Sequence, residues 1–532
     1  MKQYIFLIAL VFGAIHVKAQ EVPVDNNPAT YAKTITTDDL KKHLSIIASD
    51  DFQGRETGSE GLAKAGKYIT KQLAQMGIQP LKQLDNSYYQ PVKYKRVAWG
   101  NVKVTANGKE FNNMRDFYTF AGISENMPEI KANEITFLGY GIDTKEYSDY
   151  DGVDVKGKVI VIYSGEPTDK SENYLISGNT VKSGWDFRRK LNVAKKKGVK
   201  LVLIIEPNTL KNINKYGRWL IEPSFKLAGG KTKGKKPSYA NHLFVSPTML
   251  KKIMGRKYKK LAKANKKIKK KGKPKNFTFK SKFVANLEKK DEILNSPNIL
   301  GFIEGSDPKL KDEIVVVSAH YDHLGYRGDD IFNGADDNGS GTTGILEMAQ
   351  AFSIAKTEGA GPRRSVLFLW VAGEEKGLLG SKYYSENPVF PLENTIADVN
   401  VDMIGRVDEI YEKAGNPNYI YVIGSDRLST ELHKINEEAN QKYGDITLDY
   451  KYNDEKDPNR YYYRSDHYNF AKHGIPSIFY FSGTHKDYHK TSDTVDKIQF
   501  DKMQKIAILI FHTAWELSNR DERIKVDVEQ KK

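Results

Sequence analysis

The hydrophobic positions in the C-terminal half of the chain fall into short, uninterrupted runs separated by polar loops. Such runs, rich in β-branched and aromatic residues, are typical of buried strands, and stretches with helical spacing lie between them. Alternating strands and helices predict an α/β domain with a mostly parallel, mixed sheet flanked by helices. We expect strands at residues 298–303, 314–318, 365–371, 396–402, 419–423 and 477–481, and helices at 340–354, 376–386 and 501–517.

The N-terminal part shows a different pattern. Apolar residues at helical spacing predict helices at 38–48 and 60–76, joined by a polar, glycine-rich loop at 50–59. No sheet is predicted before residue 125. We therefore expect residues 20–125 to pack as helices on the main C-terminal domain, 290–522, which a polar tail at 523–532 follows.

The middle of the chain predicts a separate unit. Residues 134–142, 157–163 and 200–205 resemble strands, residues 191–197 a helix, and residues 277–287 a further strand. No cluster of histidine and acidic residues follows these strands. Residues 126–289 are therefore predicted to form a small α/β domain inserted into the larger one.

The 532-residue length fits two or three domains, and the N-terminus resembles a secretory signal. Lys2 precedes an apolar stretch at 4–15, and Val17-Lys-Ala19 resembles a cleavage site. This predicts a signal peptide at 1–19 and export to the periplasm or the medium, with a buried N-terminal helix as the alternative. The chain has no cysteine, which excludes disulfides and thiolate chemistry, and no later hydrophobic run is long enough for a transmembrane segment.

The net charge of +16 is concentrated in the Lys-rich segment 251–282. The simpler interpretation is a solvated helix and loop. The alternative is contact with an anionic surface or polymer. Arginine and aromatic residues are sparse in the segment, so we expect no nucleic-acid partner.

Histidine and acidic residues follow the predicted strands of the C-terminal domain. The carboxyl ends of parallel strands lie along one edge of a sheet, so residues distant in sequence converge there. Imidazole and carboxylate groups, without thiols, suit zinc. Two divalent cations would be balanced by three carboxylates and a bridging hydroxide. The five candidate metal ligands are His320, Asp337, Glu375, Asp402 and His489.

The order of these motifs resembles the co-catalytic two-zinc exopeptidase family of clan MH. That family includes secreted aminopeptidases, glutamate carboxypeptidase and, more distantly, glutaminyl cyclase. The resemblance covers about 30–125 and 290–520, and it implies a phosphorylase/hydrolase-like zinc-exopeptidase fold. The inserted unit is similar to a protease-associated domain. The motifs are His320-Tyr-Asp322, Gly334-Ala-Asp-Asp-Asn-Gly-Ser-Gly341, Gly373-Glu-Glu-Lys-Gly377, Asp402-Met403, Tyr488-His-Lys-Thr-Ser-Asp493, Gly139-Tyr-Gly-Ile-Asp143 and Asp151-Gly-Val-Asp-Val-Lys-Gly-Lys158.

The resemblance implies roles for these residues. His320 and Asp402 would hold one zinc ion, Glu375 and His489 the other, and Asp337 would bridge the two. Glu374 would be the general base, and Tyr488 resembles a residue that donates to the developing oxyanion in some members. Asp322 would accept the second ring N–H of His320. Asp493 is a candidate for hydrogen bonding to a ligand or, alternatively, for a helix cap.

The expected function is a secreted zinc aminopeptidase that acts on peptide substrates. A carboxypeptidase of the glutamate carboxypeptidase type would need cations in the cleft to hold substrate carboxylates, and Arg406 and Arg464 are the candidates. A glutaminyl cyclase would use one zinc ion. A binding protein with a vestigial metal site is a further alternative. The oligomeric state is left open.

Several other residues have two interpretations. His323 and His485 flank proposed ligands and are candidates for the wall of the cleft, while His467 is a candidate for the substrate pocket or for loop structure. Asp336 fits turn chemistry as well as metal binding.

Overall fold

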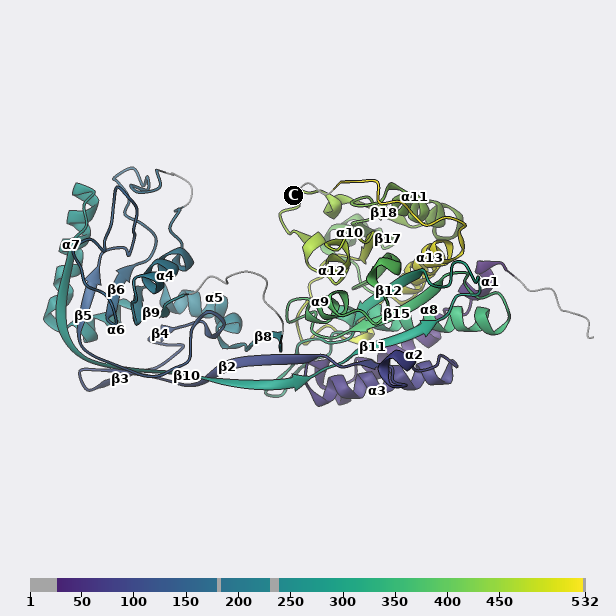
Figure 1. The fold of residues 1–532 in the computed structure, drawn as a ribbon, viewed down its shortest axis with the longest axis horizontal. Helices are drawn as coiled ribbons and strands as arrows, with labels where there is room; N and C mark the ends of the chain where they lie inside the picture. Colours follow the sequence, from purple (N-terminus) through teal and green to yellow (C-terminus); the bar gives the residue numbers. More distant parts are fainter. Residues whose placement is uncertain (1–25, 179–182, 230–238, 530–532) are drawn as a thin grey trace, which may run out of the picture. The chain divides into compact units, whose positions relative to one another are not determined.

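The computed structural model describes residues 26–178, 183–229 and 239–529 (Figure 1). The predicted signal peptide lies outside the described residues. The chain divides into two compact units. The first consists of Met1–Gln90, Ile299–Val371 and Tyr384–Lys532, and the second of Pro91–Asn298 and Ala372–Tyr383. Among the described residues, no helix is long and apolar enough to cross a membrane.

An eight-stranded mixed sheet forms the centre of the first unit. The four central strands, β15, β12, β16 and β19, run parallel, whereas β11 joins one side and β17 the other in antiparallel orientation. This confirms the predicted fold class. Along the sheet the order is β1 (Tyr89–Gln90), β11 (Asn298–Ile303), β15 (Ser365–Val371), β12 (Ile314–His320), β16 (Thr395–Val401), β19 (Ser477–Phe481), β17 (Tyr419–Ile423) and β18 (Thr447–Asp449).

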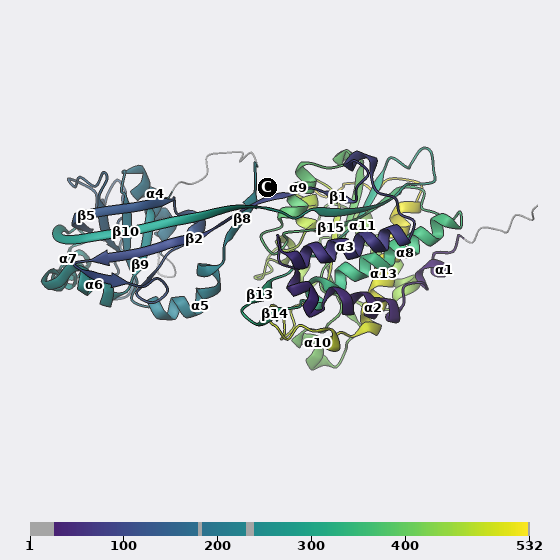
Figure 2. The same cartoon turned by 90° about the horizontal axis from the view of Figure 1, so that it is seen from below.

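Alternate residues of each strand point to opposite faces of the sheet. Helices cover both of these faces. On one face, Phe352 of α8 meets Phe368 of β15 with ring centroids 5.8 Å apart. On the other, Leu367 and Leu369 pack with Tyr384 and Phe470. Figure 2 shows α8 (Gly341–Thr357), α13 (Phe500–Asn519), α2 (Thr37–Ile47) and α3 (Glu60–Gln75) together; smaller helices are α1 (Pro28–Ala32), α9 (Leu379–Glu386), α10 (Glu409–Ala414), α11 (Thr430–Ala439) and α12 (His467–Ala471).

The helix predicted at 376–386 begins later, at Leu379. Gly377 has φ 102° and Leu378 has φ 56°, so neither can be part of a right-handed helix. The residues before α9 therefore form a turn that directly follows β15. This turn carries the Glu374–Glu375 pair.

The second unit contains a nine-stranded sheet with helices on both faces. Helices α6 (Pro247–Met254) and α7 (Lys259–Lys271) cover one face, and α4 (Phe187–Lys196) and α5 (Thr209–Ile221) the other. The strand order is β3 (Lys109–Phe111), β2 (Lys93–Ala106), β10 (Asn276–Asn295), β5 (Met127–Leu138), β6 (Val159–Tyr163), β7 (Leu201–Ile205), β9 (Asn241–Val245) and β4 (Phe117–Tyr118), with β8 (Ser224–Leu227) beside β2.

The boundary of this unit differs from the one predicted at residue 126. Residues 91–125 contribute β2, β3 and β4 to the sheet of the second unit instead of packing as helices on the first. β2 was not recognised because it is only partly buried and Gly100 and Asn101 interrupt its alternation. It is held by a long antiparallel ladder with β10, a contact too distant in sequence for a local pattern to reveal.

Candidate metal centre

Three predicted ligands converge at the carboxyl edge of the central sheet. His320 is the last residue of β12, and Asp402 follows the last residue of β16. These strands are parallel neighbours, so their ends meet. Asp337 lies in the turn Ala335–Ser340 that leads into α8. All three side chains are buried, and their ligand atoms lie within 4.8 Å of one another.

The distances within this group fit a single metal ion. His320 Nε2 lies 3.5 Å from Asp337 Oδ1 and 3.4 Å from Asp402 Oδ1. Ligands about 2.0–2.1 Å from a tetrahedral zinc ion stand roughly 3.3–3.4 Å apart. Asp402 Oδ1 is buried and accepts no hydrogen bond from the described residues. A cation at this point would neutralise that oxygen, so the residues present fit the metal that the donor set suggests.

The second oxygen of Asp337 faces a different set of side chains. Asp337 Oδ2 lies 3.0 Å from His489 Nε2 and 3.7 Å from His323 Nδ1. One Asp337 oxygen therefore faces each group. A carboxylate placed in this way can hold two cations at once.

His323 was expected only as a candidate for the cleft wall, yet it belongs to this second group. Its imidazole is fully buried, and its ring centroid lies 5.9 Å from that of His489. The signal was present in the sequence, since His323 stands three residues after His320 at the same strand end. The second group thus offers two imidazoles beside the Asp337 carboxylate.

The orientation of His320 is set by the main chain of Asp322. His320 Nδ1 lies 3.0 Å from the Asp322 carbonyl oxygen, whereas Asp322 Oδ1 is 3.8 Å away. A carbonyl oxygen only accepts, so Nδ1 carries the proton and Nε2 faces the carboxylates. The Asp322 carboxylate itself accepts a 2.7 Å hydrogen bond from Thr57. The expected residue therefore orients the ring, but chiefly through its backbone.

Asp493 supports the turn that carries Asp337. Its carboxylate accepts hydrogen bonds from the backbone N–H groups of Asp336, at 3.1 Å and 3.2 Å, and Asp337, at 3.2 Å. Burial, together with the neighbouring Asp336 carboxylate, raises the pKa of Asp493. Asp336 in turn accepts from Gly405 N and lies 3.4 Å from His485 Nε2. Asp336 thus connects two loops at the sheet edge.

Arg406 is held inside the protein and does not line the site as a free cation. It is 8% exposed, donates a 2.8 Å hydrogen bond to Asp487 and lies 3.8 Å from Asp493. Although burial opposes the effect, hydrogen bonds from Ser492, Arg406 and Lys497 hold the pKa of Asp487 well below its usual range. The guanidinium charge of Arg406 therefore interacts with carboxylates of the protein itself.

Arg55 is a structural residue that the sequence analysis missed. It lies in the segment predicted as a polar loop, yet it is fully buried. Its guanidinium donates to four carbonyl oxygens, including those of Tyr321 at 3.1 Å, Asn333 at 2.7 Å and Gly334 at 2.9 Å. Arg55 therefore joins the end of β12 to the loop that leads to Asp337.

The two residues with predicted catalytic roles lie beside proposed ligands. Glu374 precedes Glu375 in the turn after β15, and its carbonyl accepts from Gly377 N and Leu378 N. Tyr488 stacks on the imidazole of His489 with ring centroids 3.8 Å apart. The Tyr488 hydroxyl accepts a 3.4 Å hydrogen bond from Arg464.

Comparisons with known proteins agree with this geometry. Residues 298–514 match the model of peptidase family M28. A probable leucine aminopeptidase from Arthroderma otae is 32% identical over 242 residues, which are 44% of this chain and 61% of the relative. Aminopeptidase YwaD from Bacillus subtilis is 28% identical over 244 residues, 44% of this chain and 48% of the relative. The match thus spans about half to three fifths of these relatives.

Solved structures share the fold over most of the chain. An aminopeptidase from Aneurinibacillus sp. strain AM-1 aligns with a TM-score of 0.56 and 19% identity, covering 95% of this chain and 99% of that one. A zinc aminopeptidase from Bacillus subtilis aligns with a TM-score of 0.51 and 18% identity, covering 93% and 99%.

Proposed function

We propose that the protein is a zinc-dependent aminopeptidase that removes residues from the free amino end of peptides. The observation that carries this proposal is the position of Asp337, whose two carboxylate oxygens face two separate groups of metal ligands. The match of residues 298–514 to the model of peptidase family M28, and similar proteins that are named aminopeptidases, support the choice of reaction.

The proposed ligands divide between two zinc ions. His320 and Asp402 would hold one ion, Glu375 and His489 the other, and Asp337 both. His323 is a further donor for the second ion, from its place beside Asp337 Oδ2. Two bound zinc ions would lower the pKa of a water molecule between them and polarise the substrate carbonyl.

Glu374 would act as the general base. It stands next to a proposed ligand in a turn, where neighbouring side chains can point in different directions, so Glu375 can bind metal while Glu374 reaches the water. Glu374 would take a proton from the attacking water and pass it to the leaving amine. If Glu374→Gln keeps its metal and still turns over at the wild-type rate, this role is wrong.

Tyr488 would stabilise the charge that develops on the carbonyl oxygen. Its ring is held against His489, a proposed ligand, and its hydroxyl carries a donor hydrogen. A preorganised donor of this kind typically contributes about a hundredfold or more to the rate. Tyr488→Phe should therefore lower kcat while KM changes little.

The internal contacts of Arg406 favour attack at the amino end. A carboxypeptidase of acidic C-termini needs cations that are available to the substrate, and Arg406 already contacts Asp487 and Asp493. Arg464 remains as a candidate, since its guanidinium lies over Tyr461 and near the Tyr488 hydroxyl. The single-zinc glutaminyl cyclase remains an alternative that a metal count of one would favour.

The second unit is proposed to be the counterpart of the protease-associated domain. The buried carboxylate of Asp149 holds the motif 139–143 in place. It accepts hydrogen bonds from Tyr140 N at 3.0 Å and Ile142 N at 3.1 Å. This fixes the glycine turn at 139–141. Export of the chain is proposed on the N-terminal sequence pattern alone.

The test uses one peptide in three forms: free at both ends, N-acetylated and C-amidated. The purified chain, incubated with zinc, should remove residues stepwise from the amino end, and mass spectrometry identifies the products. Acetylation should abolish cleavage and amidation should not. Cleavage from the other end, blocked by amidation, would establish a carboxypeptidase instead.

A further inference from the structure

The Lys-rich segment forms a continuous cationic surface on the second unit. Residues 251–282 contain fifteen lysines, one arginine and no aspartate or glutamate. All sixteen cationic residues are exposed. Because the whole chain has a formal net charge of +16, this one segment accounts for the excess of positive charge. We call these residues the lysine face.

The fold holds the lysine face in place. Leu261, Ala264 and Ile268 of α7 are buried in the hydrophobic clusters of the second unit. Asn265 of the same helix accepts a 2.7 Å hydrogen bond from the hydroxyl of Tyr140. At 100° per residue, the eight lysines of α7 occupy an arc of roughly 200° on the opposite side. The apolar stripe of α7 is thus used for packing, and the lysines point outward.

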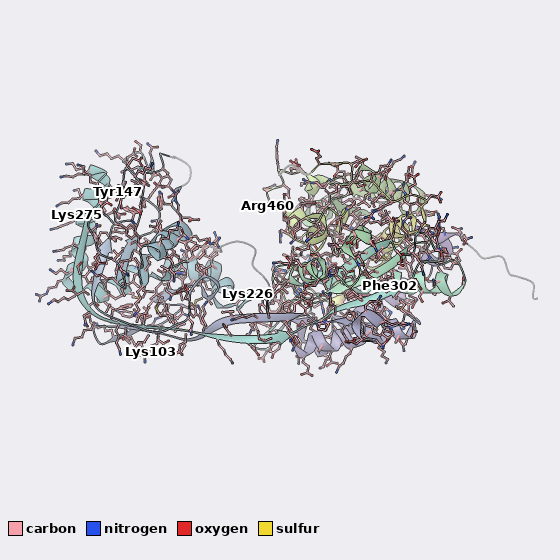
Figure 3. The ribbon with its side chains drawn as sticks, viewed as in Figure 1. Lys103, Tyr147, Lys226, Lys275, Phe302 and Arg460 are labelled. Carbon is pink, nitrogen blue, oxygen red and sulfur yellow. The ribbon has the colours of Figure 1, made fainter. Side chains whose placement is uncertain are left out.

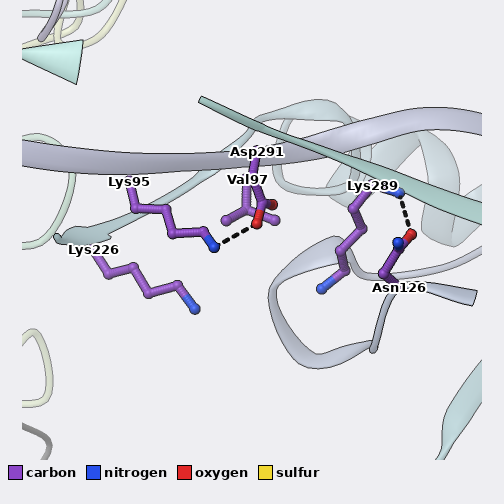
Figure 4. Close-up of a pocket in the computed structure, with 6 residues that line it drawn as sticks. All are labelled: Lys95, Val97, Asn126, Lys226, Lys289 and Asp291. Carbon is purple, nitrogen blue, oxygen red and sulfur yellow. Dashed lines mark hydrogen bonds and ion pairs between the residues drawn. The ribbon is translucent and has the colours of Figure 1, made fainter. Parts of the chain in front are cut away.

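Several lysines elsewhere in this unit pair with carboxylates, whereas in the described structure the lysines of the lysine face form no ion pair with a carboxylate; Lys269 donates to the Thr168 hydroxyl instead. Lys103, Lys131 and Lys158 pair with Glu110, Glu129 and Asp154. In the cavity of about 360 Å³ shown in Figure 4, Lys95 pairs with Asp291, and Lys289 donates to the Ser124 carbonyl. Within the described part of the chain, no ion pair joins a cation of 251–282 to a carboxylate.

The crowding of like charges makes this surface unfavourable on its own. Lys259 and Lys263, and Lys266 and Lys270, stand four residues apart on one helix, where like charges repel. In Figure 3, Lys275, just beyond α7, lies at the outer edge of the unit. An anionic partner would relieve the repulsion of all these groups together.

The chemistry of the lysine face favours a lipid surface over a nucleic acid. Lysine ammonium groups are point charges without the planar fork of arginine, and the aromatic residues of the segment, Tyr258, Phe277 and Phe279, are not exposed. Clusters of four to eight basic residues bind anionic lipid headgroups electrostatically. None of the exposed large hydrophobic residues falls within 251–282, so no side chain is available for insertion into the hydrocarbon.

We propose that the lysine face binds an anionic phospholipid membrane surface by electrostatic attraction alone. Headgroups are mobile within a membrane, so anionic lipids can gather beneath a cluster of positive charges. Binding should be peripheral and reversible by salt, because the attraction falls off within a Debye length. This proposal does not depend on the peptidase reaction.

Two variants with equal loss of charge test it. The face variant carries Lys259→Gln, Lys263→Gln, Lys266→Gln and Lys270→Gln. The control variant carries Lys103→Gln, Lys131→Gln, Lys158→Gln and Lys197→Gln, four exposed lysines of the same unit that pair with carboxylates. Circular dichroism and hydrolysis of a soluble peptide should be unchanged in both. This separates failure of membrane binding from failure of the proposed function.

The readout is co-sedimentation of the full chain with lipid vesicles. Wild type should bind vesicles that contain phosphatidylglycerol at least tenfold more tightly than pure phosphatidylcholine vesicles, and about 1 M salt, which shortens the Debye length to about 3 Å, should release it. The face variant should bind at least tenfold more weakly, and the control variant within about twofold of wild type. Equal loss in both variants would contradict a defined face. Failure to bind the anionic vesicles would overturn the proposal, even if an acidic polysaccharide were bound.

Discussion

Ser465 Oγ donates a 2.7 Å hydrogen bond to Oδ2 of Asp402, and this bond leaves Oδ1 of Asp402 facing His320. Ser465 is itself fixed, since its hydroxyl accepts from Asn400 Nδ2 at 2.8 Å. Asn400 Oδ1 in turn accepts a hydrogen bond from the Ser318 hydroxyl of the neighbouring strand. A polar chain inside the sheet therefore orients a proposed ligand.

Ser465→Ala should weaken zinc binding without unfolding the protein. Removing a hydrogen bond to a ligand typically costs about 10–100-fold in metal affinity. We expect a loss of at least tenfold, measured by competition with a chromogenic chelator. Ser477→Ala is the matched control, because Ser477 is also buried in the sheet but donates only to the Ile475 carbonyl. Equal losses in the two variants would mean that the Ser465 bond has no specific role.

Arg55→Lys should lower the stability of the first unit. Lysine cannot span four carbonyl groups, and each buried carbonyl left unsatisfied costs about 1–3 kcal/mol. We expect a decrease of about 3 kcal/mol or more in the free energy of unfolding, measured in urea. Arg460→Lys, at an exposed position, should change it by less than about 0.5 kcal/mol. If Arg55→Lys unfolded at the same urea concentration as wild type, these hydrogen bonds would contribute little to stability.

A buried pair between α2 and α8 gives a second stability test. His43 Nε2 lies 3.1 Å from Glu347 Oε1, and His43 Nδ1 lies 2.7 Å from the Tyr68 hydroxyl. Burial raises the pKa of Glu347. Glu347→Leu should cost about 3–5 kcal/mol, because it leaves His43 buried without this partner.

The double variant His43→Phe with Glu347→Leu should cost clearly less than the sum of the two single changes. Replacing both members of a buried pair by apolar residues leaves neither polar group buried without its partner. A double-mutant cycle from urea unfolding measures this difference. Strict additivity would show that the two side chains do not interact.

Lys190 makes the stability of the second unit depend on pH. Burial lowers the pKa of Lys190 to about 7, while its ammonium group donates to the Tyr163 carbonyl at 2.9 Å. The unfolded chain keeps its lysine proton up to a pKa of about 10.4. Between pH 7 and pH 10 the unfolded state therefore binds more protons, and stability rises with pH by at most about 1.4 kcal/mol per unit.

Lys190→Met should remove this rise, because methionine does not titrate. Urea unfolding at several pH values, followed by tryptophan fluorescence, provides the measurement. The exposed Lys200→Met serves as the control and should leave the pH profile as in wild type. A profile that Lys190→Met leaves unchanged would place the proton uptake elsewhere.

The sequence predicted the sheet edge well because its strands are buried on both faces and stand out as continuous apolar runs. His320 and Asp402 follow two such runs, and the structure brings them together with Asp337. Asp322 lies beside His320, but its carbonyl oxygen is nearer to the ring than its carboxylate is. Spacing cannot distinguish a side-chain acceptor from a backbone one.

What the sequence did not reveal depends on distant contacts. β2 is only partly buried and is fixed by pairing with β10, so residues 91–125 were wrongly assigned as helices packed on the first unit. Arg55 resembled an exposed loop residue, because its acceptors are carbonyls contributed by other segments. His323 was expected at the wall of the cleft, because its spacing from His320 places it at the same strand end but does not show that it reaches Asp337 Oδ2.

The central claim is that Asp337 connects two metal sites, and zinc stoichiometry tests it most directly. Wild-type protein, dialysed against trace-metal-free buffer after loading and measured by inductively coupled plasma mass spectrometry, should hold two zinc ions per chain. His489→Ala should retain about one, and Asp337→Ala should retain less than one, because it removes a ligand from both sites. One zinc ion in wild type, unaffected by His489→Ala, would contradict the account.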